Sequence, residues 1–189
     1  SNFGDALVSD AFSCSHRAHA STEGLAHLLP SVAGRLMQVE VESITSALER
    51  PEAPVAAFVG GAKISTKIEV LGNLTKKVDL LFIGGGMANT FLYAQGKEIG
   101  RSICEKHLFN LAIEILENAK KFNCNIHLPI DFACAQEFEE YQERNIYDVN
   151  SCPADKIILD VGPKTILKIT TILQDSKTLI WNGPLGAFE

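Results

Sequence analysis

The sequence lacks any apolar run long enough to cross a membrane. None of its 189 residues lies in a stretch approaching the roughly eighteen apolar residues that a spanning helix needs, and its first residues do not read as a signal peptide. We therefore expect a cytoplasmic protein with no membrane partner. The chain also lacks a net positive charge, since 17 basic residues against 23 acidic ones give a formal net charge of −6. Surfaces that bind nucleic acid are basic, so no nucleic-acid partner is expected.

Paired cysteines are missing as well. The five cysteines are odd in number and show no Cys-x-x-Cys spacing, which argues against a disulfide framework and against a zinc site. We expect them to be reduced and mostly buried. His16 and His19 are spaced to share a helix face as a metal pair, but no third ligand accompanies them. We predict structural histidines and no metal ligands in this chain.

Short apolar runs alternate with helical patterns from Val55 onward. This alternation predicts a doubly wound α/β domain, in which a mostly parallel sheet carries helices on both faces. A helix is expected near residue 64, another near 87, a long one up to 121 that opens on a capping box of Ser102 and Glu105, and one over 165–173. The expected strands are 55–59, 80–83, 126–129, 132–135, 157–160 and 178–181.

One amphipathic helix is expected ahead of this domain, over residues 36–48. Its apolar residues recur at helical spacing, and Pro51 and Pro54 follow it. The helix therefore reads as a connector, and the compact series of strands and helices begins after it.

Two lysines follow the paired glycines after the first of these strands. Lys63 and Lys67 lie four residues apart, so a helix beginning there would place both ammonium groups on one side of its first turn. Cations at a helix N-terminus oppose the helix dipole and repel each other, and a bound anion would remove both penalties. An ordinary turn with two solvated lysines is the alternative. The spacing of a Walker A loop is absent.

Glycines collect after four of the predicted strands. They are Gly60 and Gly61, Gly84 to Gly86, Gly162, and Gly183 with Gly186. Ligands of doubly wound folds bind beyond the carboxyl ends of the strands, so this pattern predicts a groove lined by backbone. The glycine spacing does not match the dinucleotide fingerprint.

The chain resembles phosphoglycerate kinase over its whole length. The motifs that carry the resemblance occur in the family's order, and the turn Gly162-Pro163-Lys164-Thr165 has the bacterial form. The others are His16-Arg17-Ala18-His19-Ala20-Ser21, Gly60-Gly61-Ala62-Lys63 with Lys67, Gly84-Gly85-Gly86-Met87-Ala88, Leu128-Pro129-Ile130-Asp131-Phe132, Asp160-Val161-Gly162-Pro163, Trp181-Asn182-Gly183-Pro184 and Phe188-Glu189.

The resemblance implies a glycolytic kinase that moves a phosphoryl group between 1,3-bisphosphoglycerate and magnesium ADP, giving 3-phosphoglycerate and ATP. It implies a monomer, whose Arg17 contacts the phosphoglycerate and whose Lys63 stabilises the phosphoryl group in flight. The residues implied to bind the nucleotide are Lys67 at its phosphates, Gly84, Gly85 and Ile103 at adenine, Asn182 near the α- and β-phosphates, Pro184 beside the nucleoside, and Glu189 at the ribose hydroxyls.

The resemblance also implies a division of the chain. Residues 1–34 would end the phosphoglycerate-binding domain, 35–54 would be the interdomain helix and linker, and 55–189 would be a nucleotide-binding domain truncated at its C-terminal end. Much of the family's basic substrate site, and the aspartate that binds magnesium, would lie outside this chain. We therefore expect the 189 residues alone to show negligible turnover.

Two alternatives stay open at this stage. The first is a noncatalytic α/β nucleotide-binding module built on a kinase-like scaffold. The second is an interaction domain whose glycines serve only its turns. The substrate loop also departs from the family pattern, because Ser9 and Ser13-Cys14-Ser15 replace its more usual residues.

Overall fold

The computed structural model describes residues 4–187. The chain divides into two compact units, Ser1–Pro51 and Glu52–Glu189. Within the described residues, no helix is both long and apolar enough to cross a membrane. All five cysteines are free thiols, three of them buried and two partly buried, which confirms the expectation for them.

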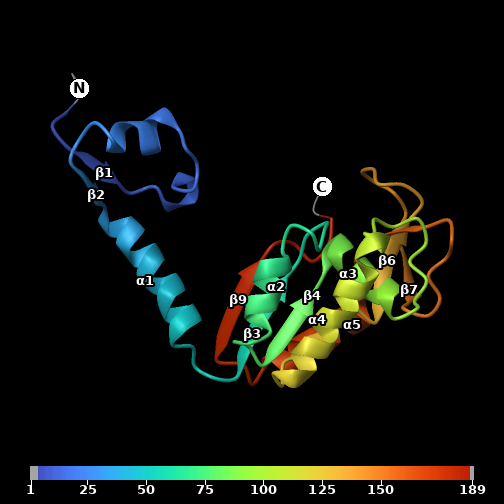
Figure 1. Ribbon diagram of the computed structural model, residues 1–189. Coiled ribbons are helices and arrows are strands. Elements are labelled where there is room, and N and C mark those ends of the chain that lie inside the picture. The colour runs from blue at the N-terminus through green and yellow to red at the C-terminus, as the bar shows by residue number, and fades with distance from the viewer. Residues whose placement is uncertain (1–3, 188–189) are drawn as a thin grey trace. The chain divides into compact units, whose positions relative to one another are not determined.

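The first unit contains two short parallel strands and one long helix (Figure 1). In chain order it has β1 (Leu7–Ser9), the short helical turns η1 (Phe12–Cys14) and η2 (Ala20–Gly24), β2 (Ser31–Ala33) and α1 (Arg35–Glu49). The helix predicted over 36–48 is thus confirmed. It belongs to the first compact unit. Asp10 accepts a hydrogen bond from the Met37 amide at 2.8 Å, and so caps α1 from the end of β1.

A four-stranded parallel sheet forms the centre of the second unit, in the order β5-β4-β3-β9. The strands are β3 (Val55–Val59), β4 (Leu80–Ile83), β5 (Asn125–His127) and β9 (Thr178–Asn182). Strand β3 is buried at every residue, because it has a neighbour on each side and helices over both faces. The connecting helices are α2 (Ile68–Leu74), α3 (Gly85–Ala94), η3 with α4 (Lys106–Leu108, Phe109–Lys121) and α5 (Pro163–Leu173).

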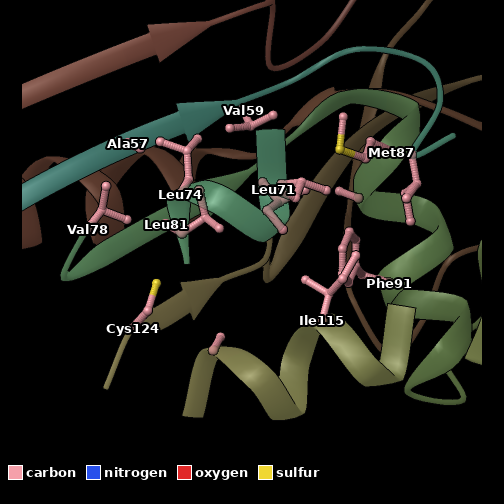
Figure 2. Close-up of a cluster of buried hydrophobic side chains, with 14 of the residues drawn as sticks. Ala57, Val59, Leu71, Leu74, Val78, Leu81, Met87, Phe91, Ile115 and Cys124 are labelled. Carbon is pink, nitrogen blue, oxygen red and sulfur yellow. The ribbon is translucent and has the colours of Figure 1, made fainter. Parts of the chain in front are cut away.

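Helices α2, α3 and α4 cover one face of this sheet. Figure 2 shows the resulting core, where Ala57 and Val59 of β3 meet Leu71 of α2, Phe91 of α3 and Ile115 of α4. Alternate residues of β3 point to this face, as the twofold repeat of a strand requires. The predicted stripe of the long helix is confirmed here, since its inward residues Ala112, Ile115 and Ala119 are buried.

Helix α5 covers the other face, over a ladder of aromatic rings. Phe58 of β3 stacks on Trp181 of β9 and on Phe82 of β4, with ring centroids 4.6 and 4.7 Å apart. Phe82 stacks in turn on His127 of β5 at 4.8 Å. These four rings occupy matched positions on neighbouring strands, so the ladder fixes the register of the sheet. The predicted doubly wound α/β fold with helices on both faces is confirmed.

A second, antiparallel sheet corrects the prediction of one sheet for all strands. Strands β6 (Asp131–Ala135), β7 (Asn145–Asp148) and β8 (Ile157–Val161) pair in the order β7-β6-β8. Pro129 follows β5 and cannot donate a ladder hydrogen bond, so the chain leaves the parallel sheet there. An apolar run such as that of β6 or β8 has the same pattern whether the strand joins a parallel or an antiparallel sheet. Strand β7 was not predicted from the sequence.

Two local predictions near the site are also wrong. Helix α2 begins at Ile68, so Lys63 and Lys67 lie in the loop before it and not on its first turn. The capping box of Ser102 and Glu105 does not form, because both side chains bond elsewhere and α4 begins at Phe109. For Ser102 and Glu105, contacts distant in the sequence replace the local cap.

Candidate functional site

A cavity of about 410 Å³ opens beyond the carboxyl ends of β3 and β4. Its walls are mostly apolar side chains and glycine backbone, a composition that suits a flat organic ring. The lining includes Gly61, Gly85, Gly86, Ile103, Phe138, Ile158, Val161, Pro184, Leu185 and Gly186. Strand β8 supplies one wall, so the antiparallel sheet helps to form the site.

Two glycines at the strand ends allow loops to approach them closely. A Cβ at Gly60 would lie 1.8 Å from the Pro184 carbonyl oxygen, and one at Gly84 would lie 2.5 Å from a methyl carbon of Leu185. The Gly85 amide donates to the Leu185 carbonyl at 2.6 Å. The segment after β9 therefore packs directly onto the turns after β3 and β4.

The lysine loop, residues 60–67, lies beside this cavity. Lys67 is partly buried, and its ammonium donates to the Gly60 carbonyl at 2.7 Å, to the Asn182 carbonyl at 3.3 Å and to the side-chain oxygen of Asn182. Burial lowers the pKa of Lys67. Lys63 is exposed, and within residues 4–187 it forms no ion pair.

Glu105, predicted to cap the long helix, bonds instead to the middle of the lysine loop. Its carboxylate accepts from the Ser65 hydroxyl at 2.6 Å and from the Ser65 amide at 3.0 Å. Slight burial acts to raise the pKa of Glu105, but hydrogen bonding to Ser65 and to the Ile64 backbone, together with the nearby His107, lowers the pKa below its usual value. The carboxylate is therefore ionised at neutral pH.

Residues 101–105, the 101–105 segment, bond to three other elements around the cavity. The guanidinium of Arg101 forms a two-pronged ion pair with Glu137, at 3.1 to 3.2 Å. The Ser102 hydroxyl accepts from the Ile158 amide at 2.8 Å, and the Ile103 carbonyl accepts from the Asn89 side chain at 3.1 Å. The segment thus ties α3 to β8 and to the residues after β6.

The structure brings most of the predicted nucleotide-site residues together. Gly85, Ile103 and Pro184 line the cavity, and Gly84 lies behind its wall under Leu185. Lys67 and Asn182 bond to each other at its edge, although 115 positions separate them. Glu189 lies outside the described residues.

Arg17 belongs to the first unit, where its Nε donates to His16 Nε2 at 3.5 Å. The sequence analysis missed Arg101 and Phe138, and also Asp160, which lines the cavity. The one sequence feature that could have indicated Phe138 is its position as an aromatic residue within the acidic run of residues 137–140. Within residues 4–187, no group of three or more His, Cys, Asp or Glu side chains is placed so that it could hold a metal ion.

The fold and the cavity define the class of protein. This is a doubly wound α/β protein with a ligand cavity beyond the carboxyl ends of its parallel strands. The chain belongs to the phosphoglycerate kinase family, whose family model matches residues 1–189. The resemblance drawn from the sequence motifs is thereby confirmed.

Curated relatives and solved structures carry the same description. The chain is 56% identical over 186 residues to a phosphoglycerate kinase of Cereibacter sphaeroides, covering 98% of this chain and 47% of the relative. It is 55% identical over 188 residues to one of Jannaschia, covering 100% of this chain and 48% of the relative. The chain thus spans about half the length of the curated relatives it matches.

The fold is also similar to that of two solved phosphoglycerate kinases. The structure from Coxiella burnetii matches with a TM-score of 0.85 and 42% identity, over 99% of this chain and 48% of that one. The structure from Pyrococcus horikoshii matches with a TM-score of 0.79 and 31% identity, over 97% and 47%.

Proposed function

We propose that this chain forms the nucleotide-binding part of a glycolytic phosphoglycerate kinase, a monomer of the cytoplasm. The reaction transfers a phosphoryl group between 1,3-bisphosphoglycerate and magnesium ADP, giving 3-phosphoglycerate and ATP. Family membership over residues 1–189 supports this proposal. The structural observation that carries it is the apolar cavity with a lysine loop at its edge.

In this proposal the adenine ring lies in the cavity. The backbone at Gly85 and the side chains of Ile103 and Pro184 would contact its faces and edges, with Gly84 holding the wall from behind. The phosphates would then extend toward Lys67 and Asn182. Lys67 now bonds to uncharged carbonyl oxygens, so a phosphate would give its ammonium a stronger partner. Glu189 is proposed to accept from the ribose hydroxyls.

Phosphoryl transfer depends on positioning and on cationic stabilisation of the moving group. Lys63 is proposed for that role because its ammonium is exposed in the same loop as Lys67. Arg17 is proposed to bind the phosphoglycerate, since its planar guanidinium suits a phosphate or a carboxylate. Magnesium is proposed to enter with the nucleotide, as the magnesium complex of ADP or ATP.

Transfer is best tested in a chimera, since the chain spans 47% of its Cereibacter sphaeroides relative. These residues would replace the 186 matching residues of that relative, and ATP formation from 1,3-bisphosphoglycerate and magnesium ADP would be measured. We expect turnover near that of the relative, and a loss of about a hundredfold or more in Lys63→Ala. Lys120→Ala changes an exposed lysine of α4 and is the matched control.

Nucleotide binding is tested in the 189-residue chain itself by calorimetric titration with magnesium ADP. Lys67→Ala and Glu189→Ala should each weaken binding by about tenfold, the effect of losing one charged hydrogen bond. An active chimera that tolerates Lys63→Ala would refute the catalytic role of that lysine. Binding without transfer in the chimera would support a noncatalytic nucleotide-binding module, and no binding would support an interaction domain.

A further inference from the structure

Ser65 lies midway between the two lysines and bonds to a single carboxylate. Its hydroxyl donates to one oxygen of Glu105 at 2.6 Å, and its amide donates to the other at 3.0 Å. The neighbouring Ile64 is fully buried in the core under the loop. The centre of the lysine loop is therefore fixed at two consecutive residues, although the residues on either side are exposed.

Glu105 is held firmly enough to serve as an anchor. Its amide donates to the hydroxyl of Thr90 at 3.0 Å, and Thr90 is fully buried in α3. The neighbouring Lys106 points to another partner, with its ammonium 5.3 Å from the centre of the Tyr93 ring. The Glu105 carboxylate is thus committed to Ser65, and both of its oxygens are used.

The same segment reaches the cavity two residues earlier. Ile103 lines the cavity, and its carbonyl is bonded to the buried side chain of Asn89. Ile103 and Glu105 are therefore both anchored to consecutive residues of α3. A rigid connection runs from the proposed adenine site to the loop that carries Lys63 and Lys67.

We propose that Glu105 is a positioning residue, which acts through Ser65 to hold the two lysines in the geometry required for phosphoryl transfer. This inference rests on the proposed function, in which Lys63 and Lys67 contact the phosphates. A displacement of about 1 Å in a reacting group costs as much as a hundredfold in rate. The loop is not helical before Ile68, and the hydrogen bond from the Lys67 amide to the Ile64 carbonyl closes only a single turn. The contact from Glu105 to Ser65 therefore adds a constraint that the local backbone does not supply.

The test uses the active chimera and compares Glu105→Ala with Glu105→Gln. The alanine variant removes both acceptors, and we expect kcat to fall by about ten- to a hundredfold while KM for ADP changes less than about threefold. Glutamine can accept from the Ser65 amide and donate to its hydroxyl, so it should restore kcat to within about threefold of the parent. Glu117→Ala, at an exposed glutamate of α4, is the control.

Ser65→Ala keeps the inference testable should Glu105→Ala fail to fold, because Ser65 is exposed. Ser65→Ala should lower kcat, and the double variant should be no worse than Glu105→Ala alone, since both changes break one connection. A parental kcat in both single variants would overturn the inference. So would a loss confined to KM or to melting temperature. Lys63→Ala in the same chimera tests the proposed function separately. If Lys63→Ala keeps the parental kcat, the proposed function fails, whatever the Glu105 variants show.

Discussion

Asp131 is almost fully buried at the start of β6, yet its carboxylate has three donors. It accepts from the Lys164 amide at 2.9 Å, and from the Thr165 amide and hydroxyl at 2.8 and 2.6 Å. The residue that precedes α5 is Gly162, which has no side chain to cap the helix. A Cβ there would lie 2.3 Å from the carboxyl carbon of Asp131. The aspartate of one strand thus supplies the cap for α5.

Asp131→Ala should therefore destabilise the second unit strongly. It would leave the buried Thr165 amide and the part-buried Lys164 amide without their acceptor and would remove the shorter of the two bonds that the Thr165 hydroxyl donates. We expect a loss of about 3 kcal/mol in the free energy of unfolding. Urea unfolding monitored by circular dichroism measures this. Asp131→Asn retains one acceptor oxygen and should lose less, and Asp155→Ala at an exposed site should change little. Equal stability of Asp131→Ala and Asp155→Ala would contradict the capping role.

His127 gives the sheet a dependence on pH. Burial lowers the pKa of His127 from its usual 6.5, and nearby Lys168 lowers it further. The unfolded chain then binds a proton more readily than the folded one, so stability is full above about pH 6.5 and falls as the pH drops toward the folded pKa. His127→Phe would keep the ring stacked on Phe82 and remove the titration.

The measurement is the melting temperature of the parent and of His127→Phe between pH 7.5 and pH 5. We expect the parent to lose more stability than the variant over the acidic part of this range. His107→Gln is the control, since that histidine is exposed. Parallel curves for the parent and His127→Phe would show that His127 does not titrate in a shifted range.

At the scale of elements, the turns after β3, β4 and β9 depend on each other. The Gly60 amide donates to the Asn182 carbonyl at 2.9 Å, and the turn after β9 packs against Gly60 so closely that no side chain fits. The lysine loop therefore packs directly against the turn after β9, at residues 182–184. A change that separates the two turns should affect stability and nucleotide binding together.

Gly60→Ala tests this layer. Its methyl group would overlap the Pro184 carbonyl, so we expect a loss of at least about 2 kcal/mol in stability and weaker binding of magnesium ADP. Gly72→Ala is a matched control, because a Cβ at Gly72 in α2 meets no atom within 4 Å. That substitution should stabilise the chain by about 0.5–1 kcal/mol, as alanine does in a helix interior. Similar unfolding midpoints for the two variants would refute the close packing at Gly60.

Helices and buried strands were predictable here because each has a periodic pattern of its own. The stripe of α4 and the apolar run of β3 needed no knowledge of their partners. Which sheet β6 and β8 join depends on pairing between distant residues, and a local pattern does not contain that information. Strand β7 was missed because its residues are only half-buried or exposed, so it lacks an apolar run.

The candidate site shows the same difference between local patterns and contacts of distant residues. Lys67 and Asn182 were predicted as neighbours in function, but only through the resemblance to a family, since 115 positions separate them. Ser102 and Glu105 had the spacing of a capping box, yet each found a partner elsewhere in the fold. The charge-assisted hydrogen bonds that Ser65 donates to the Glu105 carboxylate are stronger than the local cap would be.

The two units of the whole molecule differ in how much apolar surface they bury. Every buried hydrophobic residue of the described chain lies between Val55 and Cys152, in the second unit. In the first unit Gly34 alone is buried among residues 4–51, and α1 exposes Leu36 and Val39 by more than half. Burial of apolar surface is the main source of stability, so the second unit should hold nearly all of the folding free energy.

Amide hydrogen exchange of the 189-residue chain tests that division. Amides of β3 and β4 should exchange only through global opening of the second unit, whereas amides of α1 should open locally and exchange at least about a hundredfold faster relative to their intrinsic rates. A shortened chain of residues 52–189 should keep the protection of β3 and the same unfolding midpoint. Equal protection of α1 and β3, or loss of β3 protection on removing residues 1–51, would show that the first unit contributes to the stability of the second.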